Sequence, residues 1–203
     1  YEDGFRIVCE RARLMNEAAG NVSGGMAAVL KLSEDEVKAL CDKAGVFAVN
    51  FNCPSQTVVA GEKEAISKFI ETAKEHGGRV VPLAVSGAFH TPYMQEASEG
   101  LAELLPGFDI SAPELPVYSN TDAQAYGKEV APTLAKQASS PVLWSRTVEN
   151  MAGSGIDTFI EAGPGKTLSG LIKKCRADVK VLNVQDQQSL DDTIISLKED
   201  GLC

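Results

Sequence analysis

The sequence of 203 residues predicts an α/β protein, with a small antiparallel unit and a larger part in which strands and helices alternate. Apolar residues recur with helical spacing over residues 4–19. Strand-like and helix-like runs then follow in the order β-α-β-β-α-β between residues 26 and 85, which is the ferredoxin-like order. After residue 91 short strand-like runs alternate with helical ones, which is typical of an α/β sheet.

Capping and turn signals set the element boundaries of the first part. Ser33 and Glu36 form a capping box, and Gly77-Gly78 ends a later helix. In order, we expect a helix at 4–19, a strand at 26–30, a helix at 33–43, strands at 46–52 and 57–60, a helix at 63–75 and a strand at 79–85.

The larger part begins with a helix at residue 91, because Thr91 suits an N-cap and Pro92 a first turn. This helix is expected to run to residue 105. The later elements are a strand at 115–119, helices at 130–138 and 144–153, a strand at 158–161, a helix from the 163–165 turn to 174, a strand at 179–184 and a helix at 190–198.

The composition excludes several classes of protein. With a net charge of −9, the chain is a poor partner for nucleic acid or anionic membranes. No apolar run approaches the roughly 18 residues of a membrane span. The first residues lack a signal-peptide pattern, and the start at Tyr1 indicates a missing upstream part. The cysteines show no metal-ligand spacing and favour a reducing, cytoplasmic location; they are Cys9, Cys41, Cys53, Cys175 and Cys203.

The two histidines have different settings. His90 follows a strand and a flexible Ser86-Gly87-Ala88 turn and precedes a helix, where α/β enzymes place reactive groups. A histidine there can act as a general base at neutral pH, and the alternative is a surface-loop histidine. His76 lies at a helix end, where we expect it to interact with the last carbonyls.

Arg11 interrupts the apolar face of the first helix, between Ile7 and Met15. A buried guanidinium without a partner is costly, so we expect an anion beside it. That anion is either a carboxylate of the protein or the carboxylate of a bound substrate, and the sequence pattern leaves both open.

Two further patterns have simpler interpretations. Gly165-Lys166-Thr167 lacks the earlier glycine of a phosphate-binding loop, because Ile160 stands there, and we interpret it as a tight strand-to-helix turn. Asn50 and Asn52 should share one face of a strand, and turn chemistry before Cys53-Pro54 explains them best. No serine lies in a Gly-x-Ser-x-Gly motif.

Five stretches, taken together in order and spacing, resemble malonyl-CoA:acyl carrier protein transacylases over nearly the whole chain. The most informative is Val85-Ser86-Gly87-Ala88-Phe89-His90-Thr91-Pro92, which is similar to the histidine motif of that family. The other four are residues 10–15 (ERARLM), 49–54 (VNFNCP), 137–144 (QASSPVLW) and 161–166 (EAGPGK).

The resemblance implies an α/β-hydrolase-like acyltransferase subdomain, residues 1–22 and 86–203, with an inserted ferredoxin-like subdomain, residues 23–85. It implies a two-step transfer in which a serine takes the malonyl group from CoA and the thiol of acyl carrier protein then removes it. The implied partners are therefore malonyl-CoA and acyl carrier protein, and no cofactor or metal ion is expected.

The resemblance also implies roles for individual residues. His90 matches the general base, and Gln137 matches the residue whose backbone carbonyl holds the other imidazole nitrogen. Arg11 matches the residue that pairs with the free carboxylate of malonyl. Met15 and Phe89 are expected to line the acyl pocket, and Asn52 to support it.

The chain departs from the family pattern because the nucleophilic serine and the glutamine of the oxyanion hole lie upstream in the family. We therefore expect the 203-residue chain to be inactive by itself. Three alternatives stay open: a non-catalytic module that binds acyl groups or carrier protein, an acyltransferase domain of a polyketide or fatty-acid synthase, and a hydrolase. An acidic carrier would need a local basic surface, and the candidates are Lys166, Lys173, Lys174 and Arg176.

Overall fold

The computed structural model describes residues 1–201, so Cys203 lies outside the described residues. The chain divides into two compact units, one covering Tyr1–Thr147 and one beginning at Val148. Within residues 1–201 there is no helix with the length and apolar character that crossing a membrane requires. The predicted boundaries at residues 22/23 and 85/86 do not coincide with this division and stay a prediction.

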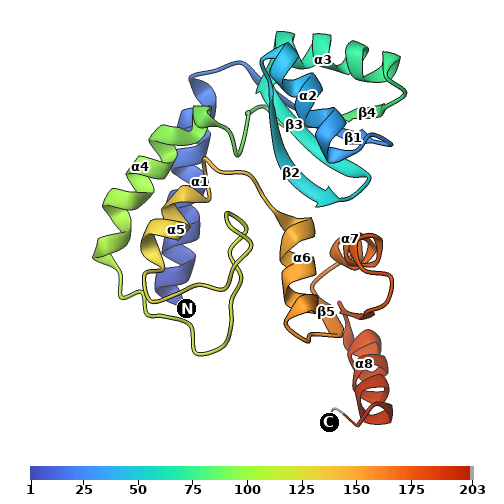
Figure 1. Ribbon diagram of the computed structural model, residues 1–203. Helices are drawn as coiled ribbons and strands as arrows, with labels where there is room; N and C mark the ends of the chain where they lie inside the picture. Colours follow the sequence, from blue (N-terminus) through green and yellow to red (C-terminus); the bar gives the residue numbers. More distant parts are fainter. Residues whose placement is uncertain (202–203) are drawn as a thin grey trace. The chain divides into compact units, whose positions relative to one another are not determined.

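The first unit contains a four-stranded antiparallel sheet of order β2-β3-β1-β4. Helices α2 and α3 cover one face of this sheet (Figure 1). This arrangement confirms the ferredoxin-like unit. The elements are β1 (Gly24–Leu30), α2 (Glu34–Ala44), β2 (Phe47–Cys53), β3 (Gln56–Glu62), α3 (Lys63–Glu75) and β4 (Arg79–Pro82).

Local signals explain where α2 begins and ends. The Ser33 hydroxyl accepts a hydrogen bond from the Glu36 backbone, and the Glu36 carboxylate accepts one from the Ser33 backbone at 2.8 Å. Gly45 ends the helix in the left-handed conformation at φ 68°. The faces of α2 and α3 toward the sheet are apolar. Val37 of α2 and Phe69 of α3 are fully buried in one core cluster with Val29 and Val59 of the sheet.

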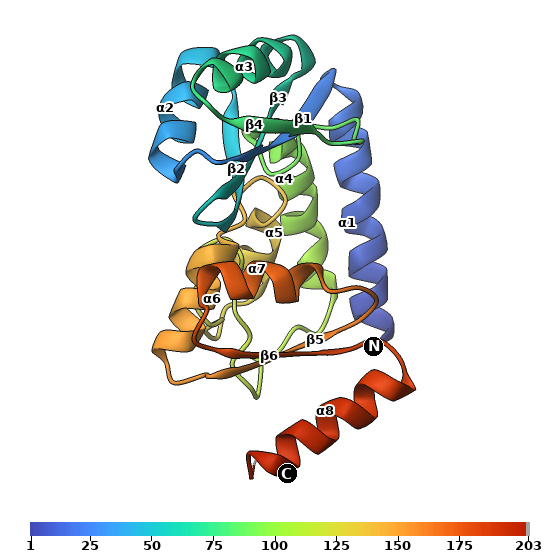
Figure 2. The ribbon, with the colours of Figure 1, turned by 90° about the vertical axis from the view of Figure 1, so that its right-hand side faces the viewer.

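The rest of the first unit is a helical layer. Helices α1 (Glu2–Gly20) and α4 (Gln95–Leu104) lie side by side (Figures 1 and 2), and α5 (Ala131–Lys136) packs on α4. A short 3₁₀ turn at Pro92–Met94 precedes α4. The buried core between these helices includes Met15, Met94, Leu101 and Leu105.

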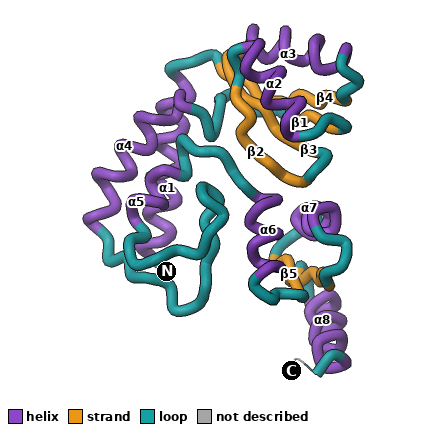
Figure 3. Tube along the Cα trace, in the orientation of Figure 1, coloured by secondary structure: helices purple, strands orange, loops and turns teal. Residues whose placement is uncertain are grey.

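The predicted strand at 115–119 is wrong. Residues between Phe108 and Val130 form mostly loop (Figure 3), with one isolated bridge between Tyr118 and Ala125. Pro113 and Pro116 lack the backbone donors of a strand, and Leu115 is 77% exposed, so no core supports a sheet there. The strand predicted at 79–85 likewise ends early, at Pro82.

The second unit is built on two parallel strands, β5 (Thr158–Ala162) and β6 (Lys180–Val184). Helices α7 (Thr167–Cys175) and α8 (Gln187–Glu199) pack on this pair and lie on its two sides (Figure 2). Helix α6 (Trp144–Gly153) begins in the first unit and ends in the second. No residue of β5 or β6 is buried, and Ile160 is 46% exposed, although parallel strands are usually covered on both faces.

Candidate active site

His90 lies in the connection from β4 to α4 and has a left-handed backbone, with φ 63°. The buried Thr91 fixes this connection, because its hydroxyl donates to the Ala88 carbonyl at 2.6 Å and accepts from the Tyr93 N–H at 3.2 Å. The predicted N-cap role of Thr91 is confirmed. The imidazole is therefore held by a capped turn rather than by a mobile loop.

The two ring nitrogens of His90 differ in their surroundings. Nδ1 lies 3.1 Å from the backbone oxygen of Gln137 and 3.1 Å from that of Ser140. Because carbonyl oxygens only accept, Nδ1 carries the proton and donates, which leaves Nε2 as the acceptor. Burial lowers the pKa of His90, and the nearby Arg11 charge lowers it further. His90 is thus a neutral base at pH 7.

Arg11 is half-buried on α1, and burial lowers the pKa of its guanidinium. Within residues 1–201 it has no carboxylate partner and no hydrogen-bond acceptor. Arg13, two residues later, pairs with Glu10 and Glu17 at 2.8 and 2.9 Å. Of the two anions considered for Arg11, the described residues supply no internal carboxylate.

Arg11 and His90 line the same cavity, which has a volume of about 550 Å³. Most of its wall is apolar, and its polar side chains are few. Its lining residues are Arg11, Ala12, Met15, Asn16, Met26, Asn50, Leu83, Val85, Phe89 and His90. An apolar chamber with one cation and one neutral base suits a short acyl group that ends in a carboxylate.

Comparison with known proteins agrees with this chemistry. The model of the acyl transferase domain family matches residues 1–192. The chain belongs to the acyl transferase domain family.

Individual relatives are similar over nearly the whole chain. It is 36% identical, over 99% of its length, to a malonyl CoA-acyl carrier protein transacylase of Bacillus subtilis. It is 41% identical, over 91% of its length, to one of Staphylococcus aureus. These alignments cover 66% and 63% of the relatives, so the chain spans just under two thirds of their length.

Solved structures of this acyl transferase family have the same fold. A malonyl CoA-acyl carrier protein transacylase from Clostridium perfringens matches with a TM-score of 0.94 and 40% identity, over 99% of this chain and 66% of that one. A malonyl-transacylase solved in complex with a type II polyketide synthase acyl-carrier protein matches with a TM-score of 0.90 and 33% identity, over 94% and 64%. The α/β fold class predicted from the sequence is confirmed.

The structure brings together most of the residues that the sequence selected in this acyl transferase. Met15 and Phe89 share the cavity of Arg11 and His90. Asn52 is not among the lining residues; Asn50 is. The register of β2 shifts between Phe51 and Cys53, so Asn52 is the extra residue of a bulge in the pairing with β3.

Sequence reasoning missed three polar contributors to this site. Asn16 and Asn50 line the cavity, and Ser140 supplies a carbonyl to His90. The position of Asn16 directly after Met15 on the first helix was the one usable signal. The role of the Ser140 carbonyl could not be predicted from the sequence, because every residue type has a backbone carbonyl.

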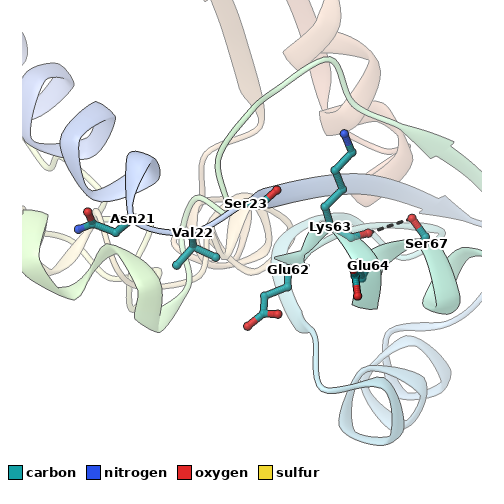
Figure 4. Close-up of a pocket in the computed structure, with 7 residues that line it drawn as sticks. All are labelled: Asn21, Val22, Ser23, Glu62, Lys63, Glu64 and Ser67. Carbon is teal, nitrogen blue, oxygen red and sulfur yellow. Dashed lines mark hydrogen bonds between the residues drawn. The ribbon is translucent and has the colours of Figure 1, made fainter.

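Three other cavities belong to the first unit, and two of them border elements that carry the site. One, of about 490 Å³, reaches His90 from α2, β2 and residues 139–146. Another, of about 570 Å³, lies where α1 passes into β1 and shares no lining residue with the Arg11 cavity (Figure 4). There the Ser67 hydroxyl donates to the Lys63 carbonyl, and the Lys63 side chain points away from those of Glu62 and Glu64.

The glycine turn of the second unit is a tight strand-to-helix turn, as the sequence predicted. The Glu161 carboxylate accepts N–H groups of Leu168 and Ser169 at the start of α7, at 3.0 and 2.8 Å. The Gly165 N–H donates to the Gln185 side chain at 2.9 Å. A carboxylate of the chain itself therefore occupies the place where a phosphate-binding loop would hold its ligand.

Other predicted features fall outside the Arg11 cavity. The His76 ring lies 2.8 Å from the Thr72 carbonyl, as expected at a helix end. Of the proposed basic docking residues, Lys173 donates to the Val179 carbonyl and Arg176 pairs with Asp178, whose pKa its hydrogen bonds lower to about 2. Residues 1–201 contain no cluster of three histidine, cysteine or carboxylate side chains placed to bind a metal ion.

Proposed function

We propose that the complete protein is a malonyl-CoA:acyl carrier protein S-malonyltransferase of fatty acid biosynthesis, and that this chain carries its base and its carboxylate site. The observation that carries the proposal is the pairing of an unpartnered, half-buried Arg11 with His90 in one cavity. The names of the relatives and their identity to this chain support it.

In the first half-reaction a serine attacks the thioester carbonyl of malonyl-CoA. We place this serine in the part of the relatives that the chain does not span. His90 Nε2 takes the proton of the serine hydroxyl as the ester bond forms. The carbon–sulfur bond then breaks, and the imidazolium returns the proton to the CoA thiolate. The product is a malonyl-serine ester and free CoA.

In the second half-reaction the phosphopantetheine thiol of acyl carrier protein attacks that ester. His90 takes the thiol proton and gives it to the departing serine oxygen, which restores the enzyme. The carbonyls of Gln137 and Ser140 act through Nδ1, since they fix the tautomer and stabilise the imidazolium during both halves.

Arg11 gives the reaction its selectivity for malonyl. Its planar guanidinium binds the free malonyl carboxylate through two hydrogen bonds, and acetyl has no carboxylate to offer. Met15 and Phe89 form the apolar wall around the short acyl chain. The reduced cysteines, which form no disulfide in residues 1–201, support a cytoplasmic location.

The deciding experiment uses the complete product of the gene and compares malonyl-CoA with acetyl-CoA as donors. Arg11→Ala should lower kcat/KM for malonyl-CoA by about 100-fold, because a lost charge-assisted contact is worth about 3 kcal/mol. Its effect on acetyl-CoA should be small. Arg13→Ala, on the exposed face of the same helix, is the matched control and should change neither.

An unaltered malonyl preference in Arg11→Ala would overturn the proposed role of Arg11. Hydrolysis of malonyl-CoA that exceeds transfer would instead favour the hydrolase alternative.

A carrier protein of type II polyketide synthesis is the second candidate acceptor. A relative that is 33% identical is a malonyl-transacylase solved in complex with such a carrier. Transfer rates to a fatty-acid carrier and to a polyketide carrier, measured side by side, distinguish the two acceptors.

A further inference from the structure

The loop between α4 and α5 contains a folded segment at residues 117–126, which we call the 117–126 turn. The chain folds back on itself there (Figure 3), and the Ser119 N–H donates to the Gln124 carbonyl at 2.8 Å. The Tyr126 N–H donates to the Val117 carbonyl, also at 2.8 Å. Ser119 is 1% exposed, so the turn is anchored in the core although it forms no regular strand.

The side chain of Tyr126 reaches from this turn to the end of α5. Its hydroxyl accepts a hydrogen bond from the Gln137 side-chain amide at 2.6 Å and also bonds to the Ser119 hydroxyl. Gln137 is the C-terminal cap of α5, and its backbone carbonyl lies 3.1 Å from Nδ1 of His90. A continuous row of hydrogen bonds thus runs from the buried turn to the imidazole of His90.

The end of α5 needs this support because the helix is short. It has six residues, and a helix of that length has few internal hydrogen bonds to hold its last turn. The last carbonyls of a helix have no partner within it, so the helix alone does not fix where they point. The side chain of Gln137 supplies the missing constraint, because it ties the residue that offers the carbonyl to Tyr126.

The second carbonyl on Nδ1, that of Ser140, is held in a different way. The Leu143 N–H, a short distance along the chain, donates to the Asn120 carbonyl of the 117–126 turn at 2.8 Å. This bond joins two backbones, so no side-chain substitution removes it directly. The bond between Gln137 and Tyr126 joins two side chains, so a single substitution can remove it and leave the rest of the segment in place.

We propose that Tyr126 is a positioning residue for the general base. Its hydroxyl holds Gln137 so that the backbone carbonyl of that residue stays on Nδ1 of His90. This inference rests on the proposed function, since it concerns the proton transfers assigned to His90. It goes beyond that function because Tyr126 does not line the Arg11 cavity and acts only through Gln137.

Loss of the Tyr126 hydroxyl should affect the charged form of His90 most. The Gln137 carbonyl raises the pKa of His90, whereas burial and the charge of Arg11 lower it. A carbonyl that moves off Nδ1 therefore leaves the imidazolium less stable and the pKa of His90 lower. Both half-reactions pass through the imidazolium, so the chemical step should slow, while binding of the substrate carboxylate at Arg11 should not change.

The main test uses the complete gene product with Tyr126→Phe, which removes the hydroxyl and keeps the ring. We expect kcat for malonyl transfer to fall about fivefold, as for one lost hydrogen bond, with KM changed by less than about twofold. The acid limb of kcat/KM should move to lower pH, because His90 becomes the weaker base. Tyr93→Phe is the matched control and should change neither, since it removes the same group near His90 but from a bond to Glu62 at 3.4 Å.

A second variant tests whether Tyr126 and Gln137 act as a unit. Gln137→Met removes the side-chain amide and keeps the backbone carbonyl, so it should lower kcat as much as Tyr126→Phe does. The double variant should then be no slower than either single variant. Losses that multiply in the double variant would mean that the two side chains act separately, which contradicts the proposal.

Histidine NMR gives a readout that does not require activity. The imidazole rings are labelled, and the His90 signals are assigned by their absence in His90→Asn. Tyr126→Phe should lower the pKa of His90, while the signals of His76, whose ring lies against its own helix end, serve as the internal reference. If the unaltered enzyme transfers no malonyl, the proposed function fails, while this titration still shows whether Tyr126 supports His90.

Two results would overturn the inference. One is a His90 titration that Tyr126→Phe leaves unmoved, because a lower melting temperature by itself would assign Tyr126 to folding alone. The other is a loss of transfer that is equal at every pH. Gln137→Met is titrated in the same way, so it decides the question even where Tyr126→Phe does not fold.

Discussion

The His90 connection of the first unit and the Glu161 turn of the second both lead from a strand into a helix, but they use their charged groups differently. Around Glu161 the carboxylate accepts the N–H groups of Leu168 and Ser169. The Gly165 N–H donates to the Gln185 side chain, and the Asn183 amide donates to the Gly165 carbonyl. Around His90 the Nδ1 nitrogen is bonded to two carbonyls, whereas Nε2 and the guanidinium of Arg11 have no hydrogen-bond partner among residues 1–201.

This difference distinguishes polar groups that stabilise the fold from polar groups that can bind a ligand. A turn whose carboxylate is bonded to its own backbone does not offer that carboxylate to a ligand, however glycine-rich it is. A turn that leaves a half-buried cation and a neutral base unsatisfied stores unfavourable free energy that a bound substrate can relieve. The comparison therefore supports the proposed chemistry at the His90 connection and a structural role for the Glu161 turn.

Replacing His90 should have the largest effect on activity. His90→Asn keeps a residue that tolerates the left-handed backbone at this position, so the fold should persist. Transfer by the complete gene product should fall about 10³-fold, because the base is lost. His76→Asn is the control, since that ring only bonds its own helix end. Comparable losses of transfer activity in both variants would contradict the assignment of the base to His90.

Arg11→Met should separate activity from stability. The malonyl preference should disappear, while the free energy of unfolding should rise by about 1 kcal/mol, because an apolar residue of similar volume replaces a half-buried charge without a partner. Chemical denaturation of the variant and of the unaltered protein measures the difference. A clear loss of stability would mean that Arg11 has a structural partner after all.

The pH dependence should follow His90. Burial holds its folded-state pKa below the ordinary value of 6.5, so the base stays neutral and the acid limb of kcat/KM should lie below pH 6.5. The unfolded chain binds the proton more readily, so stability should fall as the pH drops through 6.5 and level off below the folded pKa. Melting curves that retain this loss in His90→Asn would assign it to another group.

Replacing Glu161 should have the smallest effect on selectivity. Glu161→Gln keeps the shape of the side chain but weakens its bonds to the start of α7, so the melting temperature should fall modestly. Bonds from Ser169 lower the pKa of Glu161, so this contribution is lost as the pH falls below 4.5. The ratio of malonyl to acetyl transfer should not change, and a changed ratio would link this turn to the acyl site.

The sequence predicted those features that depend on residue type and spacing. The strand order of the ferredoxin-like unit, the cap at Thr91 and the placement of Arg11, Met15, Phe89 and His90 all follow from local pattern or shared motifs. The strand at 115–119 failed because strand propensity was given more weight than the two prolines and the lack of a covering core.

Other features depend on three-dimensional contacts that no pattern encodes. The bulge at Asn52 arises from the pairing of β2 with β3, and the presence of Asn50 in the cavity wall depends on how β2 packs beside α1 and the His90 connection. A Cβ at Gly87 would collide with the Phe89 ring and with Cβ of Ala19 on α1, and no sequence pattern reveals these contacts. Both are properties of packing between segments that are distant in sequence or folded back on themselves.

Gly24, where the chain enters the ferredoxin-like sheet, lies in backbone contact with Ala88, which follows the last strand of that sheet. An inserted subdomain whose first and last residues meet at one point can be lengthened, shortened or exchanged without moving the elements on either side of the insertion. The ferredoxin-like sheet is attached to α1 and α4 in this manner. Its outer loops can therefore change in length without moving α1 or α4, whereas any side chain at Gly24 would push the two connecting segments apart.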